Sequence, residues 1–356
     1  MRCAEARGGR ARNAVRRLAT GLVVASLAVA TGLGFLAPEA RAARIEPQAV
    51  SLRVTPIPSF AIGRDDDRFG RLTFLGGLEL QSGNRNMGGL SGLVVTPDGG
   101  RMIAIADNGL WFEAEIVADA SGRPTDVRDG RIAPIIGPGG LSLADVGRND
   151  SEAVTLRRAP EGDELFVSTE RDPRIYAFPW PLDPAAPGRE IATPEGIKHL
   201  RHNKGMEAMA AANSGPLEGA LVVIAERGPD NEADLPGFLI GGPRPGTFTV
   251  ERQNAYDATD AAFLADGDLL LLERRFTLRH GIGMRIRLLP AAELVPGGHV
   301  RGSVLLEAGY TDQIDNMEGL AVHRNAAGET ILTIISDDNR SILQRTLLLR
   351  FRLDPA

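Results

Sequence analysis

One short pattern recurs five times along the chain, and this repeat limits the choice of fold more than any other feature. Each copy places one residue, an acid in four of the five copies, directly before a short apolar run. The five residues are Gly92, Glu152, Glu207, Asp260 and Glu318, separated by steps of 60, 55, 53 and 58 residues. A repeat of this size indicates that one supersecondary unit is stacked several times.

Each repeat has the same internal order. The first apolar run is followed by a turn rich in Pro, Asp, Gly or Asn, and a second apolar run then ends in an acid. The strand-end acids are Asp107, Glu170, Glu226, Glu273 and Asp337. Most repeats add a third run, and the alternation and β-branched content of these runs predict strands joined by hairpins. Helical periodicity of useful length is absent.

Several consecutive strand meanders at this period predict an all-β fold, a β-propeller with five visible repeat units. A sixth blade remains open if residues 230–250 or 50–80 contain a divergent copy. The stretch "RLTFLGGLEL" (71–80) lies outside the repeats and is expected to pair with "TLLLRFRL" (346–353). That pairing would close the ring and hide its strand edges. A pair of β-sandwiches is the alternative, but it does not explain the period.

The N-terminal residues 1–42 have the pattern of a secretory signal peptide. A basic leader precedes the apolar stretch 18–37, and Ala40-Arg41-Ala42 forms a small-x-small cleavage site. An uncleaved anchor is the alternative, and Arg16-Arg17 raises the twin-arginine export route. The sequence therefore predicts a periplasmic or secreted monomer without stable membrane insertion after cleavage, in which residues 43–356 form a single propeller domain.

Charge and cysteine content exclude several classes of function. Cys3 is the only cysteine and would leave with the leader, so the mature chain would have no disulfide, thiol nucleophile or thiolate metal site. Residues 1–42 carry seven Arg and two Glu, so their removal changes the net charge from −6 to −11. An acidic protein of this kind is not expected to bind nucleic acid. It is better suited to bind metal ions.

The four repeated acids are the candidate metal ligands: Glu152, Glu207, Asp260 and Glu318. If they precede the innermost strands, their carboxylates converge at one end of the central channel. Crowded like charges raise each other's pKa unless a cation is present, and oxygen ligands without thiolates suit Ca²⁺ or Mg²⁺. The alternative is a structural role, in which each acid binds strand-end amides of a neighbouring blade.

Basic residues beside the acids supply the catalytic candidates. Arg227 and Arg274 follow strand-end acids and could bind phosphate at a channel mouth. His202 and Lys204 lie in "HLRHNKG" (199–205), just before Glu207, which could form a substrate-facing loop with a general acid. Ion pairs between blades and a solvated basic loop are the alternative interpretations.

The stretches "GGLSGLVVTPDGGRMIAIADN", "NKGMEAMA", "LLLLERRF" and "DNMEGLAV…ILTIISDDN" resemble the bacterial family of phytase-like domain proteins, described as "esterase-like activity of phytase". The resemblance runs from about Phe74 to Leu353. It implies a propeller fold, and the family's name implies phosphoester hydrolysis. Gly92 stands where the other repeats have an acid, so a ring of acids would be incomplete.

Two functional hypotheses follow from the sequence. The first is an exported metal-dependent hydrolase, with Ca²⁺ as the expected cofactor, that acts on a phosphoester or a related ester, a lactone included. The second is a non-catalytic propeller that binds a ligand or partner on one face, since a propeller supports many functions.

Overall fold

The computed structural model describes residues 46–202, 204–231, 233–277 and 281–355. The predicted signal peptide, with its cysteine, lies outside these residues. The described strands all belong to one compact unit, Ala43–Ala356. None of its described helices is long and apolar enough to span a bilayer.

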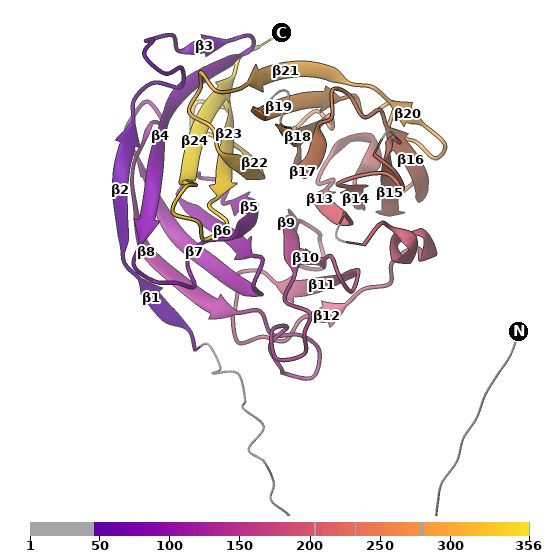
Figure 1. Ribbon diagram of the computed structural model, residues 1–356. Helices are drawn as coiled ribbons and strands as arrows, with labels where there is room; N and C mark the ends of the chain where they lie inside the picture. Colours follow the sequence, from indigo (N-terminus) through magenta and orange to yellow (C-terminus); the bar gives the residue numbers. More distant parts are fainter. Residues whose placement is uncertain (1–45, 203, 232, 278–280, 356) are drawn as a thin grey trace, which may run out of the picture. The chain divides into compact units, whose positions relative to one another are not determined.

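Five antiparallel meanders make up this unit (Figure 1). Blade 1 contains β5 (Leu90–Val95), β6 (Arg101–Ala106), β7 (Leu110–Ala118) and β8 (Pro124–Pro134). Blade 2 contains β9 (Ser151–Arg157), β10 (Glu164–Thr169), β11 (Arg174–Pro179) and β12 (Arg189–Glu190). Blade 3 contains β13 (Met206–Ala211), β14 (Ala220–Ala225), β15 (Leu235–Gly241) and β16 (Gly246–Val250). Blade 4 contains β17 (Asp257–Phe263), β18 (Leu269–Thr277), β19 (Gly281–Leu289) and β21 (Ser303–Ala308).

Blade 5 is built from both ends of the domain. It contains β22 (Asn316–Arg324), β23 (Thr330–Asp337), β24 (Thr346–Leu353), β4 (Leu72–Ser82) and β2 (Leu52–Ile57), with β3 (Arg68–Phe69) beside β4. Strand β4 pairs antiparallel with β24, in a register that places Leu78 opposite Leu348. The predicted closure of the ring by the N-terminal strand is therefore confirmed.

The blade count is five. The two regions that left a sixth blade open belong to existing blades, because residues 235–250 form β15 and β16 and residues 52–82 form β2 and β4. Two further short strands extend outer edges: β1 (Gln48–Val50) pairs with β8, and β20 (His299–Val300) pairs parallel with β16. The helices in the described chain are two short 3₁₀ turns, η1 (Glu195–His199) and η2 (Gly215–Leu217).

Every blade buries both of its faces. Five hydrophobic clusters each join side chains of two neighbouring blades, one cluster for each interface of the ring. In β18 the alternation is direct, since Leu269 and Leu271 pack toward blade 3 while Leu270 and Leu272 pack toward blade 5. A strand buried on both faces gives a continuous apolar run rather than an alternating one, which explains the run of four leucines.

The innermost strands β5, β9, β13, β17 and β22 contact one another in ring order. Each is the first strand of its blade, so all five run in the same direction along the channel. Their N-terminal ends, and with them the segments that carry the repeated acids, therefore lie at one end of the channel.

Candidate metal centre

A β-bulge lies near the start of every innermost strand. The extra residue of the bulge is Gly92 in β5, Glu207 in β13, Thr259 in β17 and Glu318 in β22. In β9 the register shifts between Ser151 and Val154, the segment that contains Glu152. A bulge turns a side chain away from the regular alternation of a strand. The bulge therefore gives Glu207 and Glu318 the same backbone position in their blades.

Asp260 does not share this position. The bulge residue of β17 is Thr259, so Asp260 lies one residue beyond the place of the other acids. Its side chain is fully buried, and its two oxygens accept backbone N–H bonds from Leu320 (2.7 Å) and Ala261 (2.8 Å). Asp260 thus connects blade 4 to β22 of blade 5, which is the structural role that the sequence left open, and it lies outside the acidic cluster described next.

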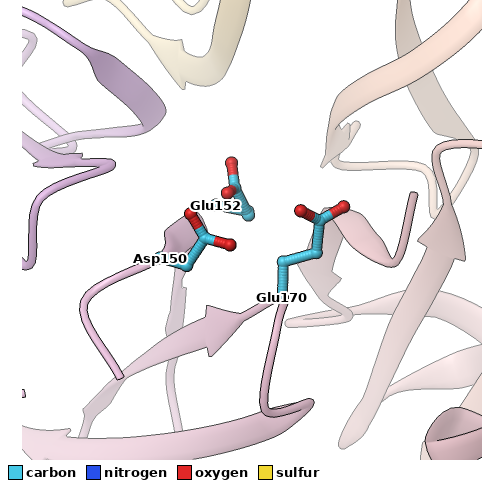
Figure 2. A group of neighbouring side chains, drawn as sticks. All are labelled: Asp150, Glu152 and Glu170. Atoms are coloured by element: carbon cyan, nitrogen blue, oxygen red, sulfur yellow. The ribbon is translucent and has the colours of Figure 1, made fainter. Parts of the chain in front are cut away.

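Five carboxylates gather at the mouth formed by blades 2 and 3. Ligand oxygens of Asp150, Glu152 and Glu170 lie within 4.8 Å of one another, and so do those of Glu170, Glu207 and Glu226. Figure 2 shows the first of these groups. We call the five residues the acidic cluster. Glu170 belongs to both groups, so the cluster is continuous across the blade interface.

Three members of this cluster were not among the predicted metal ligands. Glu170 and Glu226 were recognised only as strand-end acids, and they lie beside Glu152 and Glu207 because an antiparallel hairpin brings the end of one strand next to the start of its neighbour. Asp150 precedes Glu152 by two residues in the "NDSEAV" stretch, which was the available signal.

The side-chain carboxylates of Glu152 and Glu207 accept no hydrogen bond and form no ion pair in the part of the chain that the structure describes. Their neighbours do, since the Gly205 backbone N–H donates to Glu170 Oε1 at 2.8 Å and Arg171 lies 3.0 Å from Asp150. Glu207 is only 6% exposed. A buried carboxylate without a donor is costly unless it is protonated or meets a cation.

The pKa values of the acids at this mouth are raised. Burial raises the pKa of Glu152 and of Glu207 well above the ordinary range, and the neighbouring carboxylates raise both further. Burial also raises the pKa of Glu318 to about 7, although Arg274 opposes the shift. A cation at the cluster would reverse these shifts, because it favours the charged form of every carboxylate around it.

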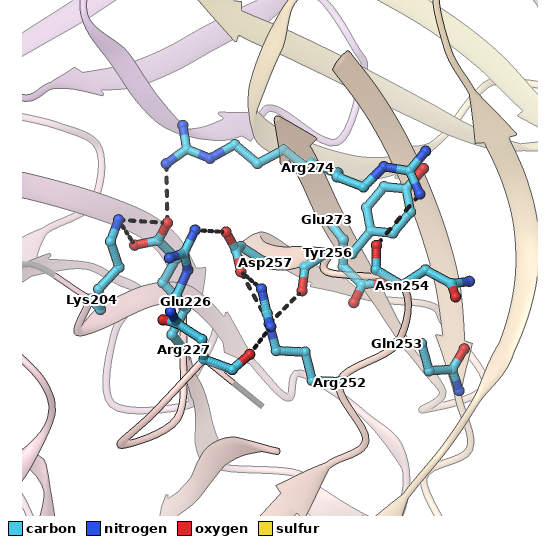
Figure 3. A network of polar contacts seen from close by, with 12 residues as sticks. Lys204, Glu226, Arg227, Arg252, Gln253, Asn254, Tyr256, Asp257, Glu273 and Arg274 are labelled. Carbon is cyan, nitrogen blue, oxygen red and sulfur yellow. Dashed lines mark hydrogen bonds and ion pairs between the residues drawn. The ribbon is translucent and has the colours of Figure 1, made fainter. Parts of the chain in front are cut away.

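Two cations of the chain lie beside the cluster (Figure 3). Lys204 Nζ is 2.6 and 2.9 Å from the two carboxylate oxygens of Glu226. Arg274 reaches Glu226 at 3.3 Å, Asn316 Oδ1 at 2.7 Å, and the carboxylate of Glu318. Glu318 thus faces the same mouth as the acidic cluster, but its carboxyl group already accepts a hydrogen bond from Arg274.

The other two catalytic candidates are placed differently. Arg227 pairs with Asp257, which Arg252 also contacts at 2.7 Å, so Arg227 belongs to an ion-pair network beside the mouth (Figure 3). His202 is exposed and close enough to Asp150 to lower its pKa slightly, against a larger rise from burial.

The strand-end acid of blade 4 pairs with arginines of its own blade. Glu273 is fully buried and binds two arginines of β19, Arg285 at 2.7 Å and Arg287 at 2.7 Å. On the side of blades 1 and 5, where Gly92 replaces an inner acid, Asp107 pairs with Arg340 at 2.6 Å. The acids of the channel end are therefore unevenly distributed, with the unpaired carboxylates at blades 2 and 3.

Comparison with solved structures finds propeller-like chains of low similarity. The catalytic domain of a GH62 α-L-arabinofuranosidase from Coprinopsis cinerea matches with a TM-score of 0.45 and 13% identity, over 81% of this chain and 99% of that one. The calcium-binding protein regucalcin from Agrobacterium tumefaciens matches with a TM-score of 0.40 and 12% identity, over 75% and 91%. The comparison with curated proteins found no match.

The family comparison is more specific. The family model described as phytase-like, "esterase-like activity of phytase", matches residues 85–340. The match includes all five innermost strands and every member of the acidic cluster. The chain therefore belongs to the phytase-like family.

Proposed function

We propose that the acidic cluster holds a divalent cation, Ca²⁺ by preference, and that the protein hydrolyses a phosphoester or a related ester at this mouth. The observation that supports this most is Glu207, a buried carboxylate that lies among other carboxylates and has no donor among the described residues. Such an arrangement is stabilised by a cation more than by any neutral neighbour.

The donor set suits a hard cation. All five members of the cluster offer carboxylate oxygens, which are the ligands of Ca²⁺ and Mg²⁺, and several carboxylates in a flexible arrangement favour Ca²⁺. A bound cation of this kind polarises a phosphoryl or carbonyl oxygen and lowers the pKa of bound water. Lys204 and Arg274, which border the cluster, would hold the anionic oxygens of the substrate.

One observation favours the second candidate, a propeller that binds a ligand without catalysis. Lys204 and Arg274 already pair with Glu226 and Glu318, so the fold neutralises part of its own mouth. In this alternative the paired side chains at the mouth bind a ligand, and the protein cleaves no bond in it.

Metal analysis and thermal melts of the purified protein in calcium and in chelator test the proposal, with Glu207→Gln as the variant. Wild type should gain roughly 2 to 4 kcal/mol of stability at about 100 to 1,000 times the dissociation constant of calcium. Glu207→Gln should lose this gain, and with it calcium-dependent hydrolysis of p-nitrophenyl phosphate or p-nitrophenyl acetate. Glu218→Gln, an exposed residue at η2, is the control and should behave as wild type.

A normal calcium response in Glu207→Gln would contradict the cation site. A calcium response in wild type without hydrolysis of either ester would contradict the catalytic proposal and leave the ligand-binding propeller as the better account.

A further inference from the structure

The opposite end of the channel contains a cavity. Its volume is about 450 Å³, and the second halves of all five innermost strands line it. Apolar side chains such as Leu156, Leu264 and Val322 contribute to the wall. This volume falls within the range of about 300 to 1,000 Å³ that small-molecule sites occupy.

Close packing of the innermost strands separates this cavity from the acidic cluster. A Cβ added at Gly92 would lie 2.7 Å from the backbone nitrogen of Val154, and one added at Gly319 would lie 2.9 Å from the Cβ of Leu93. Asp260 also crosses between strands at this level through its bond to the Leu320 amide. The two ends of the channel are therefore different sites.

The charges around the cavity are opposite to those of the acidic cluster. None of the described residues that line it is an Asp or Glu, although the chain has 46 acids and 40 bases. Its charged lining residues are Arg158 and Arg324, at the ends of β9 and β22. Both are exposed, and neither guanidinium has a hydrogen bond or an ion pair with a described residue.

Free guanidinium groups at the rim of a partly apolar cavity suit one kind of ligand. A guanidinium binds a carboxylate with two parallel N–H···O bonds, and the side chains deeper in the cavity can cover an apolar tail. We propose that this end of the channel binds an organic carboxylate with an apolar tail, its head at Arg158 and Arg324 and its tail against the walls formed by Leu156 and Val322. This site is independent of the proposed hydrolysis at the other end.

Isothermal titration calorimetry with octanoate on the purified protein tests this site. Octanoate should bind, whereas 1-octanol, with the same tail and no charge, and octylammonium, with the opposite charge, should bind at least about tenfold more weakly. The double variant Arg158→Gln/Arg324→Gln should weaken octanoate binding by about tenfold or more. Arg53→Gln, an exposed arginine on the outer strand β2, is the matched control and should bind as wild type.

Glu207→Gln distinguishes the two sites, because this variant should bind octanoate as wild type does even when its calcium binding is lost. The proposal is overturned if octanoate does not bind. It is also overturned if octanol or octylammonium binds equally well, or if the double variant binds octanoate as wild type does.

Discussion

Glu318 shows how a single carboxylate at the mouth connects charge to stability. Its pKa rises from the ordinary value of 4.5 to about 7, chiefly through burial and despite its contact with Arg274. The folded protein therefore keeps this proton over a pH range in which the unfolded chain has released it. The folded state binds more protons than the unfolded state between about pH 4.5 and 7, so the free energy of unfolding must fall as the pH rises through this window.

We expect this group alone to remove about 3 kcal/mol of stability between pH 4.5 and 7.5 in chelator, at about 1.4 kcal/mol for each pKa unit. Urea unfolding of wild type and Glu318→Gln at several pH values measures the difference. The variant keeps an acceptor for Arg274 and Asn316, so its stability should fall less steeply with pH. Equal slopes for the two proteins would show that Glu318 does not hold a proton in the folded state.

Asp260 gives the contrasting case of an acid with a structural role. Both of its oxygens accept backbone N–H bonds, so Asn, with one acceptor oxygen, leaves one buried amide without a partner. Asp260→Asn should lower the free energy of unfolding by about 1 to 3 kcal/mol. Denaturant unfolding with calcium and with chelator should give the same loss. A loss of stability seen only in the presence of calcium would instead place Asp260 among the metal ligands.

At the scale of elements, the closure of the ring depends on β4 fitting between β2 and β24. Gly77 pairs with Ile57 on one side and Leu349 on the other. A Cβ at this position would lie 2.6 Å from Leu349 Cδ2 and 3.1 Å from the backbone oxygen of Leu348. A side chain at Gly77, the second glycine of "FLGGLEL", would therefore force both Leu349 and the backbone of β24 to shift.

Gly77→Val should destabilise the domain by about 1 to 3 kcal/mol or more, because the backbone of β24 cannot move away without breaking the ladder. Gly83→Val is the matched control, since a Cβ at Gly83 has no neighbour within 4 Å. Thermal melts of the two variants compare them directly. Equal melting temperatures would mean that the closing strand tolerates a side chain at this point.

At the scale of the whole molecule, the five clusters between blades distribute the core around the ring, so no blade is stable without its neighbours. Closure by β4 and β24 ties the two ends of the domain into blade 5. A protein without a cysteine in its described residues must rely on this closure rather than on disulfides.

We propose that the full chain is exported and cleaved near Ala42, from the basic leader, the apolar stretch and the Ala-x-Ala site of its sequence. Intact-mass measurement of the protein recovered from periplasm or medium should give the mass of a chain that begins near Ala43. Recovery of the full-length mass from the same fractions would favour an uncleaved anchor.

The sequence by itself predicted the five repeated blades and the closure of the ring, and it left a sixth blade open. A strand buried on both faces, and the turn that follows it, leave a signal within a few neighbouring residues, as the leucines of β18 do. The stretch 71–80 belonged to no repeat, and the stretch 346–353 at the other end of the domain was available to pair with it. The direction of the innermost strands followed from the same repeat, so the sequence also placed Glu152, Glu207 and Glu318 at one channel end.

Only the tertiary structure decided which acids are free to bind a cation. The bulge of β17 falls at Thr259, so Asp260 lies one residue beyond it and accepts the backbone N–H of Leu320 on β22. The carboxylate of Glu207, at the bulge of β13, has no such donor. Ion-pair partners such as Arg274 and Glu318 lie 44 residues apart in the chain and meet across a blade interface. The period-2 alternation of a strand does not reveal where a β-bulge inserts an extra residue. No local sequence pattern indicates which charged side chains meet across the ring.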